Sequence, residues 1–130
     1  MDPAARDPDP AAATPALGHL RRELARGTAE LAVLSVLAQG RHYGYALLKQ
    51  LQAIRGAEFE VKEGTLYPLL HRLEDAGHIA GEWHSEGRMP PRKYYVLTDS
   101  GKARLGLLVS EWRNLIASVQ RLLELYEEQP

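Results

Sequence analysis

Residues 64–74 read Gly-Thr-Leu-Tyr-Pro-Leu-Leu-His-Arg-Leu-Glu, and their leucines recur at helical spacing. One face of a helix from about residue 65 to residue 76 would hold all four: Leu66, Leu69, Leu70 and Leu73. Gly77 supplies the stop, and Pro68 is placed in the first turn, where a missing N–H costs little. The leucine stripe predicts a buried face, so the polar side chains of this helix face largely outward.

Two helices are predicted at the N-terminal end. Charged and apolar residues at helical spacing favour a short helix over residues 17–26, ended by Gly27. Thr28 then resembles an N-cap, and the helix that it begins would end at Gly40.

A further helix is predicted immediately before the leucine-rich one. It runs from about Tyr43 to Ile54, and Gly56 ends it. Its apolar face consists of Leu47, Leu48, Leu51 and Ile54. A connector that contains Phe59 and Val61 leads on to the leucine-rich helix.

Beyond Gly77 the period of the apolar residues changes from near four to two. Residues 79–84 and 93–97 are predicted strands, and the loop between them exposes Arg88 and Arg92. Two strands joined by an exposed basic loop form a hairpin wing. The order helix, helix, helix, hairpin, helix predicts a mainly α (α+β) fold: a winged helix-turn-helix with a two-stranded wing and a long C-terminal helix.

Thr98 and Asp99 cap the last predicted helix, which would be about 45 Å long. Its apolar residues follow the 3-4 spacing of the a and d positions in a coiled coil: Leu105, Leu108, Trp112, Leu115, Val119, Leu122 and Tyr126. A helix this long cannot bury so wide a face on its own small domain, so a second copy of the same helix is the simplest partner. Residues 98–130 are therefore assigned as a dimerisation helix. The alternative is a helix that folds back on the N-terminal helices of one chain.

The chain has 130 residues, 16 basic and 17 acidic, and no cysteine. The length suits one domain. The absence of cysteine excludes disulfides, thiolate metal sites and thiol nucleophiles. No apolar run approaches the roughly 18 residues of a membrane span, and no secretory signal is visible, so a cytoplasmic location is expected.

Residues 1–16 hold four of the eight prolines and little to bury, which predicts a disordered tail. Residues 17–97, assigned as the winged helix-turn-helix domain with its N-terminal helix, carry 11 basic and 9 acidic residues and are the only net-basic part.

A winged helix-turn-helix places its second helix in the major groove of double-stranded DNA and its wing on the backbone or in the minor groove. The candidate phosphate contacts are Tyr43, Lys62, Arg88, Arg92 and Lys93. The candidates to read base edges are Thr65, Tyr67 and His71, and Arg72 lies on the same outward side of the helix. Tyr67 could instead reach a phosphate through its hydroxyl. Taken alone, His71 and Arg72 could be an ordinary solvated face, and the wing cations an ordinary loop.

Three segments resemble the PadR family of bacterial transcriptional regulators: residues 42–49 (HYGYALLK), 64–74 (GTLYPLLHRLE) and 92–101 (RKYYVLTDSG). A single C-terminal helix, in place of a larger C-terminal domain, resembles the short subfamily of that group. The resemblance covers about residues 22–126 and implies a homodimeric repressor that binds a palindromic operator and is often released by a small molecule. It also implies that Trp112 can line an apolar cavity between subunits and stack on a planar apolar or cationic ligand. Met89-Pro90-Pro91 departs from the family's compact wing.

The main alternative function is a winged-helix adaptor that binds proteins and never DNA. Enzyme classes are poorly supported. Tyr45 and Lys49 match the Tyr-x-x-x-Lys spacing of some dehydrogenases, but no glycine-rich dinucleotide loop follows a strand. His78, Glu82 and His84 alternate onto one face of a strand, but no third ligand cluster supports a metal site there. We therefore predict neither catalysis, nor a cofactor, nor a bound metal.

Overall fold

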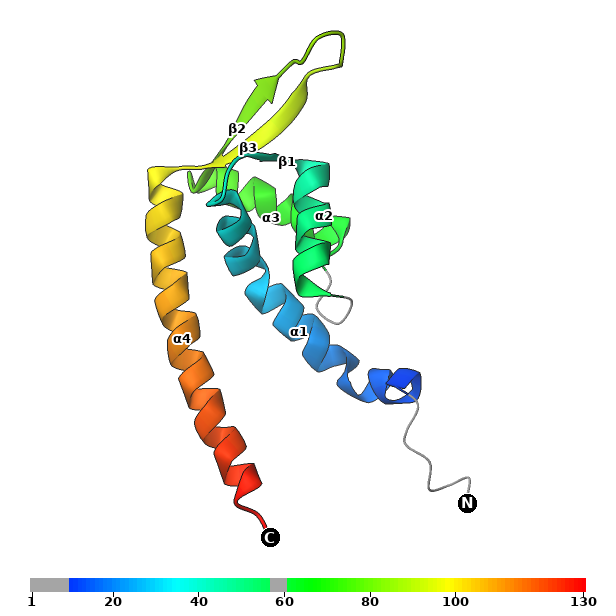
Figure 1. The fold of residues 1–130 in the computed structure, drawn as a ribbon, viewed down its shortest axis with the longest axis vertical. Coiled ribbons are helices and arrows are strands. Elements are labelled where there is room, and N and C mark those ends of the chain that lie inside the picture. Colours follow the sequence, from blue (N-terminus) through cyan, green and yellow to red (C-terminus); the bar gives the residue numbers. More distant parts are fainter. Residues whose placement is uncertain (1–9, 57–60) are drawn as a thin grey trace.

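The computed structural model describes residues 10–56 and 61–130, and its main elements follow the predicted order. They are α1 (Pro10–Leu37), β1 (His42–Tyr43), α2 (Gly44–Arg55), α3 (Glu63–Asp75), β2 (Ile79–His84), β3 (Arg92–Leu97) and α4 (Asp99–Glu127). Figure 1 shows α1, α2 and α3 gathered below the β2–β3 hairpin, with α4 leaving the hairpin as one long helix. The predicted mainly α winged helix-turn-helix with a long C-terminal helix is confirmed.

The sheet has a third strand that was not predicted. Its order is β1-β3-β2, and both pairings are antiparallel. His42 and Tyr43 of β1 lie opposite Tyr95 and Tyr94 of β3. Two residues are too few to give an alternation signal, so the pairing becomes visible only once β3 is placed beside the start of α2.

The hydrophobic core lies between α1, α2 and α3, and its buried side chains are aliphatic: Ala29, Val33, Leu34, Val36, Leu37, Leu47, Leu48, Leu51, Val61, Leu66, Leu69, Leu70, Leu73 and Ile79. The predicted leucine stripe of α3 is therefore confirmed. Ile54 is 61% exposed and was wrongly assigned to the buried face of α2. At that turn Arg55 faces α1 instead, and its guanidinium donates hydrogen bonds to the Ala25 carbonyl at 3.3 Å and to the Thr28 hydroxyl. Phe59 of the predicted connector lies outside the described residues.

One helix, α1, replaces two predicted helices and part of the predicted tail. It begins at Pro10, so the end of the tail is helical, while residues 1–9 lie outside the described part of the chain. Proline is favourable at the first helical position, and three alanines follow it. Gly27 does not end the helix, and Thr28 does not cap one, because its hydroxyl donates to the Leu24 carbonyl at 2.7 Å. Packing of the rest of α1 outweighs the roughly 1 kcal/mol cost of an interior glycine.

The helix α3 begins at Glu63, two residues earlier than predicted, and this changes the position of Pro68. Lys62 is the N-cap, with extended backbone angles (φ −97°, ψ 162°). Pro68 therefore lies in the second turn, where the carbonyl of Gly64 loses its helical N–H partner. Gly64 is exposed, so solvent can hydrate that carbonyl. Gly77 (φ +80°) follows the helix end, as predicted.

The first half of α4 is fixed to the rest of the chain. As predicted, Thr98 caps the helix, and its hydroxyl accepts a hydrogen bond from the Gly101 N–H at 3.0 Å. Arg104 pairs with Glu30 of α1, with Nε donating to Oε1 at 2.7 Å. The apolar side chains of the second half are exposed: Leu115, Ile116, Val119, Leu122, Leu123, Leu125 and Tyr126. Among residues 10–56 and 61–130, no helix combines the length and the hydropathy of a membrane span.

Candidate nucleic-acid interface

The exposed side of α3 carries the side chains predicted to approach DNA bases. Thr65, Tyr67, His71 and Arg72 are all exposed to solvent. Lys62 is exposed at the N-cap, where the free N–H groups of the first turn and the helix dipole favour an anion. The helix therefore presents polar and cationic groups to solvent along most of its length.

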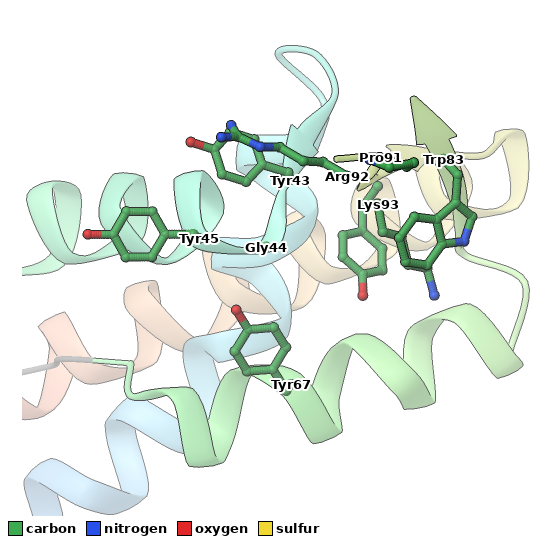
Figure 2. A pocket seen from close by; sticks show the side chains of 9 residues that line it. Tyr43, Gly44, Tyr45, Tyr67, Trp83, Pro91, Arg92 and Lys93 are labelled. Carbon is green, nitrogen blue, oxygen red and sulfur yellow. The ribbon is translucent and has the colours of Figure 1, made fainter. Parts of the chain in front are cut away.

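A cleft of about 550 Å³ opens between the start of α2, the helix α3 and the wing, which is the β2–β3 hairpin with its loop (Figure 2). Its lining is Tyr43, Gly44, Tyr45, Tyr67, Trp83, Pro91, Arg92, Lys93 and Tyr95. Tyr67 points from α3 toward the start of α2, and a Cβ on Gly44 would lie 3.0 Å from its ring. Four predicted phosphate or base contacts thus come together around one cleft: Tyr43, Tyr67, Arg92 and Lys93.

Pairing of β1 with β3 brings two arginines onto tyrosine rings across the pairing. The guanidinium carbon of Arg92 lies 4.8 Å from the ring centroid of Tyr43. Arg41 stacks on Tyr94 at the same distance, and its Nη1 lies 3.4 Å from Nε2 of His84. Stacking orders the plane of a guanidinium and leaves its edge able to bind a phosphate.

Lys93, one of the candidate phosphate contacts, is paired with a carboxylate of its own chain. Its Nζ donates to Oε1 of Glu74 at 2.9 Å, and each of the two side chains is 29% exposed. This hydrogen bond holds the pKa of the Glu74 carboxyl below its ordinary value and raises the pKa of the Lys93 ammonium group. The positive charge of Lys93 is therefore balanced within the protein before any phosphate approaches.

Arg88 lies at the exposed tip of the wing, outside the cleft. Gly87 adopts a left-handed backbone (φ +58°), and the N–H of Met89 donates to the Glu86 carbonyl at 3.1 Å. These features close a turn around Arg88. The structure accordingly separates Arg88 from Arg92, which lies at the start of β3.

The predicted dimer seam on α4 has two parts. Leu105 and Leu108 are half-buried and pack against the core of their own chain, so the alternative of a folded-back helix describes this first part. Trp112 is also half-buried. The rest of the seam is exposed, and consists of Leu115, Val119, Leu122 and Tyr126.

Of the three residues considered for a metal site, Glu82 and His84 contact each other, and His78 has a different partner. Nε2 of His84 lies 3.1 Å from Oε2 of Glu82, whereas Nδ1 of His78 lies 2.9 Å from the Ser100 hydroxyl. Among the described residues, no three His, Cys, Asp or Glu side chains come together as a metal ion would require.

Sequence reasoning missed three side chains of this surface: Arg41, Tyr45 and Trp83. Arg41 precedes a strand too short to be predicted, and Tyr45 was considered only as part of an enzyme motif and of the family-like segment 42–49. Strand alternation places Trp83 on the same face as the buried Ile79, which predicts burial. The strand extends past the core, however, and Trp83 is 69% exposed beside the cleft. A large aromatic residue next to a basic loop was the available signal.

Known proteins resemble this chain over most of its described length. Residues 33–107 match the family described as the transcriptional regulator PadR-like family. A crystal structure of a PadR family transcriptional regulator from Eggerthella lenta is 40% identical with a TM-score of 0.71, over 86% of this chain and 92% of that one. A transcriptional regulator of Mycobacterium tuberculosis is 35% identical over 85 residues, 65% of this chain and 75% of that protein. The negative transcriptional regulator PadR of Bacillus subtilis is 34% identical over 74 residues, 57% of this chain and 41% of that protein.

Proposed function

The chain belongs to the PadR-like family of transcriptional regulators, and from that premise we propose that it is a homodimeric repressor of a palindromic operator in double-stranded DNA. Each protomer places α3 in a major groove, and the two helices lie about 34 Å apart, one turn of DNA. Family membership makes the chain a regulator rather than an enzyme.

The cleft between α2, α3 and the wing is the observation that supports this proposal most directly. It combines the stacked Arg92 guanidinium with the hydroxyls of Tyr43 and Tyr67, which are suited to phosphate oxygens. Thr65 and His71 on the exposed side of α3 then read base edges. Positive groups that flank a helix with a polar exposed face are the arrangement that sequence-specific DNA binding requires.

Exposed apolar residues support the homodimer. The second half of α4 leaves Val119 and Leu122 in solvent, and the start of α1 leaves Leu17, Leu20 and Leu24 there. Large apolar stretches of this kind usually mark an interface, and the heptad spacing of α4 fits a second α4. A two-fold dimer would also match the symmetry of a palindromic operator.

The salt dependence of DNA binding tests the proposal. We expect the logarithm of the association constant for a duplex selected from a random library to fall linearly with the logarithm of salt concentration, by about 0.9 for each phosphate neutralised. Arg92→Ala should weaken binding to every sequence and flatten the slope by about 1 per protomer bound. Fluorescence anisotropy with a labelled duplex measures both quantities.

Arg121→Ala is the matched control for this measurement. Arg121 lies nine residues after Trp112 on α4, which at 100° per residue is the opposite side of the helix from the heptad stripe. The variant loses the same charge and should keep the wild-type slope. Binding that does not depend on salt, or an absence of DNA binding, would instead favour the protein–protein adaptor.

A planar apolar or cationic molecule at the α4 seam is the effector that we propose for release from the operator. Trp112 is half-buried at an a position of the heptad, where it would face the seam. A ligand can switch the regulator only if it binds with different affinity to two dimer conformations that differ in the distance between their α3 helices.

Tryptophan fluorescence tests the effector. The chain has two tryptophans, so Trp83→Phe leaves Trp112 as the single one. Quinoline or acridine cations should quench the fluorescence of Trp112 in this variant. The same compounds should weaken operator binding by about tenfold, a typical allosteric coupling. Trp112→Ala should abolish this weakening. Unchanged operator affinity at saturating compound would refute the switch.

A further inference from the structure

Glu74, at the end of α3, binds both strands of the wing with one carboxylate. Its Oε1 accepts a hydrogen bond from Nζ of Lys93 on β3 at 2.9 Å. Its Oε2 accepts a hydrogen bond from the backbone N–H of Gly81 on β2 at 3.1 Å. We call these three residues the helix–wing clamp, because they connect the helix with both strands of the wing.

The N–H of Gly81 is available to the clamp because β2 is an edge strand. The sheet order is β1-β3-β2, and Gly81 lies opposite Tyr95 of β3. Since the Gly81 N–H donates to Glu74, it points away from β3 and toward α3. An unpaired edge N–H that is partly buried is costly, so Glu74 both satisfies this group and fixes the position of the strand.

Gly81 has no room for a side chain while the clamp is closed. A Cβ at this position would lie 2.7 Å from Oε2 of Glu74 and closer still to Cε of Lys93. Both obstacles are ends of flexible side chains, so alanine would displace them without moving the strand. The substitution Gly81→Ala therefore opens the clamp and leaves both charges in place.

We propose that Glu74 is a positioning residue that sets the specificity of DNA recognition by holding the wing at a fixed angle to α3. This inference rests on the proposed function. Bases read by α3 and phosphates held by the wing lie on one duplex, so both sets of contacts form together only at one relative orientation. A wing that is free to turn can still bind phosphates on any sequence, whereas the base contacts of α3 are lost.

Glu74→Gln is the first variant that tests this proposal. The quantity to measure is the ratio of affinities for a library-selected duplex and for a scrambled duplex of equal length and composition. We expect the ratio to fall about tenfold, comparable to the loss of one good base contact. Gly81→Ala should lower it to a similar extent. Asp75→Asn removes an equal charge from the next, exposed residue of α3 and should keep the ratio within about twofold of wild type.

The affinity ratio separates positioning from stability, because a loss of folded protein lowers both affinities alike. A wild-type ratio in Glu74→Gln or in Gly81→Ala would overturn the proposal. An equal fall in Asp75→Asn would also overturn it, since charge alone would then explain the effect. If wild-type protein selects no sequence from the library, the proposed DNA-binding function itself fails, and that result is distinguishable from the other two.

Discussion

Replacing Gly101 with alanine is expected to lower the free energy of unfolding by about 3 kcal/mol, a large part of what a domain of this size has. Gly101 is the one buried residue of α4 in the described chain. A Cβ on it would lie 2.6 Å from Cδ1 of Leu97 and closer still to the carbonyl oxygen of His78. The second obstacle is backbone, which cannot rotate aside as a side chain can.

Hydrogen bonds hold the same backbone in place, so it cannot move without further cost. The His78 carbonyl accepts from the N–H of Thr98 at 3.2 Å, and the hydroxyl of Thr98 donates to the Gly77 carbonyl at 2.6 Å. Relief of the alanine clash would stretch these bonds and weaken the cap of α4. The expected effect therefore combines overpacking with loss of the junction between α4 and the wing.

Gly106→Ala is the control, because it makes the same chemical change in the same helix. A Cβ at Gly106 meets no heavy atom within 4 Å, so alanine should raise stability by up to about 1 kcal/mol through its helix propensity. Urea unfolding followed by circular dichroism, at one fixed protein concentration, measures both variants. Changes of the same sign and size would contradict the packing of α4 against His78.

Periodic sequence features predicted most of the fold. The leucine spacing of α3, the alternation in β2 and β3, and the heptads of α4 each extend over several residues, so chance matches are improbable. Features that depend on one or two residues were less predictable. Gly27 and Thr28 are frequent at helix ends, yet Arg55, 27 residues beyond Thr28, binds that hydroxyl and fits it into a continuous helix.

The interface could be predicted residue by residue only where exposure follows from helical geometry. Exposure of Thr65 and His71 follows from the leucines beside them on α3. The environment of Lys93 does not, because its partner Glu74 is 19 residues away and the two meet only when the wing packs on α3. The stacking of Arg92 on Tyr43 likewise requires the β1–β3 pairing. Composition therefore indicated the charge of this surface, and tertiary structure determines which cations remain available.

Val119→Asp is expected to convert the proposed dimer into monomers and to weaken operator binding by more than about 100-fold. Val119 occupies an a position in the exposed half of α4 and is 41% exposed in the single chain. In a two-fold interface each substitution appears twice across the seam, so two carboxylates would be buried in apolar surroundings. Sedimentation velocity measures the association state, and anisotropy with operator and half-site duplexes measures DNA affinity.

The size of the expected loss in operator affinity follows from the dimer, which links the α3 helices of its two protomers. In a dimer, binding of one half-site holds the second α3 near the other half-site at a high effective concentration, which monomers lack. The variant should therefore bind a full operator no more tightly than a half-site duplex. Leu107→Asp is the matched control, because Leu107 is 66% exposed and lies at an outer position of the same heptads. The Leu107→Asp variant should keep the dimeric state and the operator affinity of the wild-type protein. A Val119→Asp protein that stays dimeric would show that α4 does not form the seam, and a monomer with wild-type operator affinity would show that DNA recognition does not depend on dimerisation.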